Sequence, residues 1–130
     1  MKKALQFLQA CGTFYLATVE KDQPRVRPFG AVCEFEDKLY IITNNQKNVF
    51  AQMRENPKVE ISGMTEGKWI RLTAEAVVDP RREAKAAMLD ANPSLRSMYS
   101  EDDGVVEVLY LQNAAVTICS FTEEPVIWQF

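Results

Sequence analysis

The chain has 130 residues, of which 47% are hydrophobic and 25% are charged. This length and this balance predict one globular domain over residues 1–130, and they exclude disordered and fibrous proteins. The formal net charge is -3 and no basic run is longer than the Arg81-Arg82 pair, so a nucleic-acid partner is not expected. No run of about 18 apolar residues occurs, so no membrane-spanning helix is expected either.

The N-terminal segment admits two interpretations. Met1-Lys2-Lys3 followed by an apolar stretch resembles a secretion signal. Two glutamines interrupt that stretch, and its apolar residues repeat at helical spacing: Ala4, Leu5, Leu8 and Cys11. An amphipathic helix that ends before Gly12 is therefore the preferred interpretation.

The next segments predict a β-meander. Residues 13–19 are rich in β-branched and aromatic side chains, which is typical of a strand. After a polar turn, residues 25–36 predict a second strand. The hairpin at Glu36-Asp37-Lys38 then leads into a third strand over residues 39–43.

A helix, two strands and another helix follow. A polar loop at residues 44–47 precedes a predicted helix over residues 48–55. Strands are predicted at residues 58–62 and 68–79, and the second of these has an alternating apolar face. Asp79-Pro80 predicts a helix start, because it offers an N-cap acceptor and a proline at the first helical position.

The C-terminal third predicts a short helix over residues 95–99 and strands at 105–111 and 114–121, hinged at Gln112-Asn113. Seven strands in this arrangement, with few helices, favour a mainly β fold with flanking short helices, built as a closed or partly closed antiparallel barrel. The apolar tail around Ile127, Trp128 and Phe130 either contacts a second copy or folds back over the barrel end.

The sequence contains no obvious catalyst. It has no histidine, which excludes Ser-His-Asp and Cys-His arrangements and most catalytic zinc sites. Its three cysteines are odd in number and lack metal-type spacing, so we expect no metal, no disulfide framework and a cytoplasmic location. Such a protein can still be an enzyme if a cofactor brings the reactive atoms. The catalytic residues are therefore unknown, and the polar clusters are candidates for binding.

The first such cluster is the segment Gln23-Pro24-Arg25-Val26-Arg27-Pro28-Phe29-Gly30. Because Pro28 lacks an N–H group, this strand must be unpaired on one side. A planar ring could lie against that edge, with Arg27 near its phosphate or its carbonyl edge. An edge strand with solvated arginines is the alternative.

The second cluster is Thr43-Asn44-Asn45-Gln46-Lys47-Asn48, between a strand and a helix. Free amides, the helix dipole, Lys47 and the Thr43 hydroxyl would favour an anion, which predicts a phosphate site. A plain capped connection is the alternative. A third cluster, Trp69 beside Arg71, offers a stacking surface and a cation for a flavin or a substrate, and a dimer contact explains it equally well.

Together these clusters resemble a known family. The segments QPRVRPFG, LYIITNNQKNVFAQMRENPKVEI and KWIRLTAEAVV, in this order and spacing, are similar to the pyridoxamine 5'-phosphate oxidase-like FMN-binding split barrels, in particular the small nitroimidazole reductase-like branch. The similarity covers nearly the whole chain, including NPSLRSMY. It implies a split barrel of six or slightly more strands, a homodimer, and two FMN sites in the grooves between protomers.

The resemblance also implies roles for nine residues. Those that would flank the isoalloxazine and the ribityl chain are Arg27, Pro28, Phe29 and Gly30. Those that would hold the phosphate end are Thr43, Asn44, Lys47 and Asn48, and Trp69 would touch the ring. The chain lacks the C-terminal extension, the histidine and the arginine that pyridoxamine phosphate oxidases use for their substrate, and the active-site histidine of some nitroimidazole reductases. The resemblance therefore implies the cofactor better than the substrate.

Three functions follow as hypotheses. The first is an FMN-dependent oxidoreductase that passes electrons from a reduced nicotinamide to a small electrophile, such as a nitroaromatic or a quinone. The second is a non-catalytic flavin carrier or sensor. The third is a binder of a related ligand, such as a deazaflavin or heme, although the usual histidine ligand of heme is absent.

Overall fold

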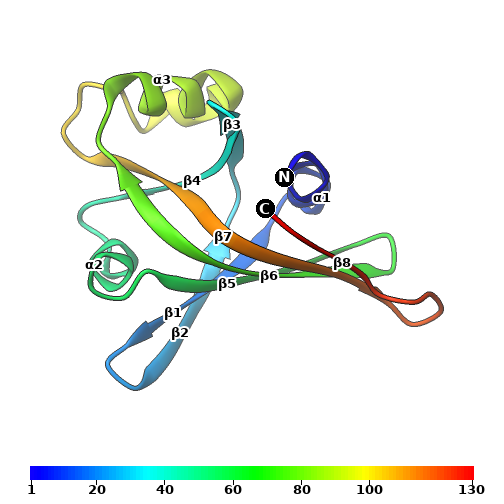
Figure 1. The fold of residues 1–130 in the computed structure, drawn as a ribbon. Coiled ribbons are helices and arrows are strands. Elements are labelled where there is room, and N and C mark those ends of the chain that lie inside the picture. The colour runs from blue at the N-terminus through cyan, green and yellow to red at the C-terminus, as the bar shows by residue number, and fades with distance from the viewer.

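Eight antiparallel strands form one curled sheet, and three short α-helices lie around it (Figure 1). The computed structural model describes all residues, 1–130. The strands are β1 Phe14–Glu20, β2 Gln23–Phe29, β3 Val32–Phe35, β4 Lys38–Asn44, β5 Lys58–Thr65, β6 Lys68–Asp79, β7 Val106–Ser120 and β8 Val126–Gln129. The helices are α1 Lys2–Cys11, α2 Asn48–Glu55 and α3 Arg82–Ala91, followed by a 3₁₀ turn, η1 Pro93–Ser97. The predicted mainly β class with short helices is confirmed.

The sheet is open between two strands that follow each other in the sequence. Its strand order is β2-β1-β5-β6-β7-β4-β3. β7 is long enough to pair with two further strands: its first part, residues 106–110, pairs with β4, and its last part, residues 115–118, pairs with β8. β2 and β3 therefore occupy opposite ends of the order, although only Gly30 and Ala31 separate them. The curled sheet thus forms a split barrel, and the split runs along the free edge of β2.

Two strand predictions were wrong in their boundaries. The strand expected over residues 25–36 is broken after Phe29, because β2 pairs with β1 whereas β3 pairs with β4 at the other end of the sheet. The two strands expected around Gln112-Asn113 are one continuous strand, β7. Asn113 adopts a positive φ of 52°, and the register of β6 shifts opposite it. The chain therefore bends there through a bulge without ending the ladder.

The helix expected from Asp79-Pro80 begins later, at Arg82. Asp79 stays in β6, where it pairs with Val108 of β7. Its carboxylate accepts a 2.7 Å hydrogen bond from the Tyr40 hydroxyl and contacts Arg81, so it serves the sheet and does not cap the helix. In contrast, α2 and β6 have the predicted bounds.

The core lies between the inner face of the sheet and the helices. In β6, Ile70, Leu72, Ala74 and Ala76 are buried, which confirms the predicted alternation. The amphipathic first helix is also confirmed, because α1 buries Ala4 and Leu8 in the same cluster. α2 adds Val49, Phe50 and Met53. α3 packs on a second, smaller cluster with β3, β4 and β7.

The C-terminal tail folds back on its own chain. β8 pairs with β7, and Trp128 and Phe130 pack against the core. Lys3 of α1 lies over the Trp128 ring, which agrees with the closeness of the two termini in Figure 1. Ile127 points the other way and is 70% exposed. None of the helices has the length and apolar character that crossing a bilayer requires.

Candidate functional site

The free edge of β2 forms one side of the site. β2 pairs with β1 and with no other strand, which confirms the prediction that Pro28 lies on a strand unpaired on one side. Pro24 and Pro28 also lack N–H groups, so this edge is poorly suited to receive another strand. The edge therefore faces a groove.

A cavity of about 290 Å³ lies in this groove. Its walls come from the end of β2, the end of β4, the start of α2 and the segment that follows α3. The lining residues are Arg27, Pro28, Phe29, Gly30, Ala31, Ile42, Thr43, Lys47, Val49, Asn92, Ser94, Leu95, Met98 and Tyr99. The structure thus brings together six of the nine predicted residues, from the two clusters that sequence reasoning treated separately.

The other three predicted residues lie elsewhere. The Asn44 amide donates to the Tyr99 hydroxyl at 2.8 Å, so it supports the cavity wall from behind. Asn48 borders a second cavity. Trp69 lies at the far end of β6, with its ring 5.0 Å from that of Phe121, and lines neither cavity. Within one chain the structure does not bring Trp69 to the site.

The second cavity, of about 600 Å³, continues along β2 toward Glu20. It shares Arg27, Pro28, Lys47 and Val49 with the first cavity. Both cations therefore lie where the two cavities meet. No carboxylate lines the first cavity, and in the second, Glu20 is paired with Arg25 at 3.0 Å.

Arg27 reaches across the inner face of the barrel. Its Nη1 donates to Thr18 Oγ1 at 2.7 Å and to the Leu16 carbonyl at 3.2 Å. Its Nη2 donates to Gln52 Oε1 at 2.6 Å. Burial, and secondarily the charge of Arg25, lower the pKa of Arg27, yet a guanidinium stays protonated in proteins. Arg27 is thus a partly buried cation without a carboxylate partner.

Lys47 and the start of α2 add further donors. Lys47 immediately precedes the helix and forms no ion pair. The amides of Asn48 and Val49 have no acceptor in the chain, as expected for the first turn of a helix. Together with the positive end of the helix dipole, these groups form a site that favours an anion.

Thr43 shows that the cavity fits a polar ligand. Its side chain is 5% exposed, and its Oγ1 is the one buried side-chain oxygen or nitrogen that lacks a hydrogen-bond partner. A buried hydroxyl left unpaired costs free energy. A phosphate or ribityl oxygen in the cavity would satisfy it, so the residues present fit a phosphorylated ligand such as FMN.

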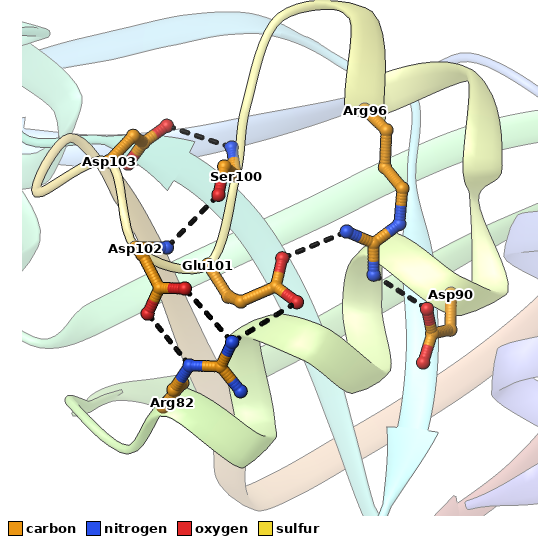
Figure 2. A network of polar contacts seen from close by, with 7 residues as sticks. All are labelled: Arg82, Asp90, Arg96, Ser100, Glu101, Asp102 and Asp103. Atoms are coloured by element: carbon orange, nitrogen blue, oxygen red, sulfur yellow. Dashed lines mark hydrogen bonds and ion pairs between the residues drawn. The ribbon is translucent and has the colours of Figure 1, made fainter.

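The outer wall was missing from the sequence prediction. Leu95, Met98 and Tyr99 close the cavity from the segment after α3, which was expected only as a short helix. Figure 2 shows how ion pairs fix this segment: Arg96 joins Asp90 at 2.6 Å and Glu101 at 2.8 Å. The position of this segment depends on tertiary packing, and no local sequence pattern predicts it.

Gln52 was also missed, although a signal existed. It lies on the buried face of α2 between Val49 and Met53 and is 6% exposed. A glutamine within an apolar helical stripe is unusual, because burying its amide is costly without partners. That position could have been selected from the helical periodicity alone.

The cysteines take no part in the site. Cys33 is buried, and burial raises its pKa to about 12. Burial also raises the pKa of Cys11. A thiol must ionise to act as a nucleophile, so neither is an activated one.

Comparisons with known proteins agree with this geometry. A family model described as pyridoxamine 5'-phosphate oxidase matches residues 1–116. The crystal structure of a NimC/NimA family protein from Clostridium acetobutylicum is 59% identical, with a TM-score of 0.98, and the match covers 100% of this chain and 92% of that one. No match was found among curated proteins.

More distant structures share the fold. A heme binding protein from Mycobacterium smegmatis has a TM-score of 0.69 at 16% identity, and the match covers 98% of this chain and 56% of that one. A pyridoxamine 5'-phosphate oxidase-related, FMN binding protein from Nostoc punctiforme has a TM-score of 0.63 at 14% identity, with 99% and 93% covered. Proteins with this fold thus hold different ligands.

Proposed function

Because the chain belongs to the pyridoxamine 5'-phosphate oxidase family, we propose that it is an FMN-binding oxidoreductase whose cofactor lies along the free edge of β2. One observation supports this most strongly: the cavity beside β2 joins two cations without carboxylate partners, Arg27 and Lys47, to an unpaired buried hydroxyl on Thr43. A phosphate on a flat heterocycle matches these groups. The FMN binding protein of the same fold supports the choice of flavin.

The residues divide the site into a phosphate end and a ring end. The phosphate would be held by Lys47, the amides of Asn48 and Val49, and the Thr43 hydroxyl, and the Arg27 guanidinium would face it where the two cavities meet. Pro28 to Ala31 would lie along the ring and the ribityl chain. Met98 and Leu95 would cover the ring and exclude water. FMN supplies hydride and electron transfer when bound, and the chain supplies binding and orientation.

The cavity in one chain is small for this ligand. Ligand pockets measure roughly 300–1,000 Å³, and the first cavity is at the lower end, at about 290 Å³. The ligand would therefore extend into the second cavity or toward a partner. A site completed by a second copy of the chain would account for the small volume of the first cavity and for its opening into the second.

The outer face of the sheet supports a homodimer. Cross-strand pairing places Tyr15, Val26, Met64 and Ile127 on this face, and each is at least 50% exposed. Such a patch marks an association surface. Trp69 lies on the same face, so its predicted contact with the ring would occur across the dimer.

Light scattering tests the dimer. Val26→Lys should reduce the mass to that of one chain, because it places a charge in the apolar patch. Ala91→Lys is the control, since Ala91 is exposed at the end of α3 and lines neither cavity. A mass that stays at two chains in Val26→Lys, or at one chain in the wild type, would contradict the proposal.

For the reaction, we propose electron transfer from a reduced nicotinamide to a nitroaromatic or a quinone. The similarity to a protein of the NimC/NimA family supports a nitro-group acceptor. The first cavity has no carboxylate or histidine among its lining residues, so the chain offers no strong general acid there. An acceptor that takes electrons and then draws its protons from water suits such a site.

The visible spectrum tests the function. Purified protein should bind FMN at micromolar concentration, lose the flavin absorption when NADH or NADPH is added, and regain it with a quinone or a nitroaromatic. A chain that binds no FMN would refute the proposal, and a Soret band would indicate heme instead. Bound FMN that no nicotinamide reduces would indicate a carrier or a sensor.

A further inference from the structure

Gln52 is held in a single orientation by two donors. Its Oε1 accepts hydrogen bonds from Thr18 Oγ1 and from Arg27 Nη2, both at 2.6 Å. Because only the oxygen of the amide can accept them, the Nε2 group must point away. Gln52 borders the second cavity, and its Nε2 donates to no group in the chain. Thr18 is also buried, at 2% exposed.

The partners of Arg27 are all neutral. They are the Leu16 and Arg25 carbonyls, the Thr18 hydroxyl and the Gln52 amide oxygen. These bonds fix the guanidinium, yet none of them cancels its charge. Its Nε–H has no acceptor in the chain, so donors also remain available beside the two cavities.

Most other arginines of this chain have a charged partner. Five of the seven pair with a carboxylate, namely Arg25, Arg71, Arg81, Arg82 and Arg96. Arg54 lies over the Phe50 ring, 5.5 Å from its centroid. Glutamate at position 52 would have nearly the same shape and would bind Arg27 more strongly. The presence of a neutral glutamine at position 52, where a glutamate would fit, therefore requires an explanation.

The geometry points to Gln52, with Thr18, as a positioning residue that fixes the Arg27 guanidinium through neutral oxygens, so that its uncancelled charge serves the anionic end of the ligand. This inference rests on the proposed FMN site, and it adds that the uncharged state of residue 52 sets the preference for a phosphorylated ligand. Glutamate there would keep Arg27 in place while cancelling its charge.

Two flavins that differ only in a phosphate group test this inference. Riboflavin is FMN without the phosphate, so the ratio of the two affinities measures recognition of the phosphate alone. Flavin fluorescence would give this ratio for the wild type and for Gln52→Glu. Ala51→Glu is the matched control, because it adds the same charge to the same helix at an exposed position that lines neither cavity.

We expect Gln52→Glu to weaken FMN binding at least about tenfold, with riboflavin affinity changed less than about twofold. Ala51→Glu should leave the ratio within about twofold of the wild type. Equal losses for both flavins would show that Gln52 only maintains the fold. A wild-type ratio retained in Gln52→Glu would overturn the inference while FMN binding itself stands.

A second measurement covers the case in which Gln52→Glu does not fold. Inorganic phosphate, titrated into the ¹⁵N-labelled wild type, should shift the Nε–H resonance of Arg27 and the side-chain amide resonance of Gln52. Arg27→Lys identifies the first resonance. Shifts in both would support the inference, and no shift at saturating phosphate would overturn it. A wild type that binds neither FMN nor phosphate would refute the proposed function as well.

Discussion

The arginines on the two sides of the cavity differ in their partners, and this difference separates structural from functional charge. Behind the outer wall, Arg82 and Arg96 meet Asp102, Asp90 and Glu101 (Figure 2). Hydrogen bonds to these carboxylates raise the pKa values of both arginines. Across the cavity, Arg27 meets only neutral oxygens, and burial lowers its pKa. The paired charges build the wall, and the unpaired charge faces the space that the wall encloses.

The paired region also contains a buried acid. Asp79 is 5% exposed and bonds to Arg81 and to the Tyr40 hydroxyl. Arg81 in turn forms two 3.0 Å bonds with Glu36. This cluster ties β6 to the start of α3 and to the β3–β4 hairpin, and none of its residues lines either cavity. We therefore expect changes here to alter stability and leave binding intact.

The largest effect should come from Asp79→Asn. It removes the negative charge that Arg81 and Tyr40 share at a position that is 5% exposed, and weakening these hydrogen bonds should cost about 2 kcal/mol. Urea denaturation would measure the loss in the free energy of unfolding. Asp102→Asn, at an exposed pair, is the control and should change the same quantity far less. Similar losses in the two variants would erase the distinction between the two acids.

The pH dependence of stability sharpens the same point. Arg81, and then Tyr40, lower the pKa of Asp79 to about 2 from its ordinary 3.8. A lowered pKa in the folded state means that the stabilisation is complete above about pH 4 and is lost as the pH falls toward 2. Unfolding free energies between pH 2 and 6 should therefore fall more steeply in the wild type than in Asp79→Asn. Parallel curves would show that Asp79 is not the responsible group.

On the binding side, Arg27→Gln should weaken FMN binding by about 2 kcal/mol, or roughly 30-fold, because it removes a charge-assisted contact. Arg25→Gln is the control on the same strand, since that side chain is already paired with Glu20. Fluorescence titration gives both affinities. If Arg25→Gln lost as much as Arg27→Gln, the lack of a carboxylate partner would not mark the functional cation.

A smaller effect is expected from Lys47→Ala. Lys47 is exposed and water screens its charge, so FMN affinity should fall about fivefold. Isothermal titration at low and high salt would check this, because the loss should shrink as salt increases. A loss that is independent of salt would indicate a steric cause.

The smallest effect should follow Arg82→Gln. This substitution opens an exposed ion pair on the outside of the wall, and FMN affinity should change less than about twofold. The same titration measures it. A loss as large as that of Arg27→Gln would mean that the paired arginines control the site directly.

The sequence predicted most of the elements and six of the fourteen residues that line the first cavity. The bounds of α2 and β6 follow from periodicity and from flanking turn residues. The break after Phe29 was not predicted. Each half pairs with the strand next to it in the sequence, β1 or β4, but β2 and β3 separate because β1 joins β5 and β4 joins β7, and no local pattern shows those two pairings. The bulge at Asn113 likewise depends on the pairing of β7 with β6.

The candidate site shows the same division. Pro28 and Lys47 were selected because proline chemistry and helix ends act locally. Tyr99 contacts Asn44 across 55 residues of sequence, so its place in the wall depends on the fold. The helical periodicity could have identified Gln52, but it could not have identified its two hydrogen-bond donors, Thr18 and Arg27. Trp69 stays a prediction that requires a second copy.

The proposed function depends on a phosphorylated flat ring in the groove along the free edge of β2. A crystal structure of the chain grown with saturating FMN would show whether it lies there. We expect phosphate oxygens within about 3 Å of the Lys47 ammonium and the Thr43 hydroxyl, with the ring along Pro28 to Ala31. FMN bound elsewhere, or a groove closed by the protein's own side chains, would contradict it.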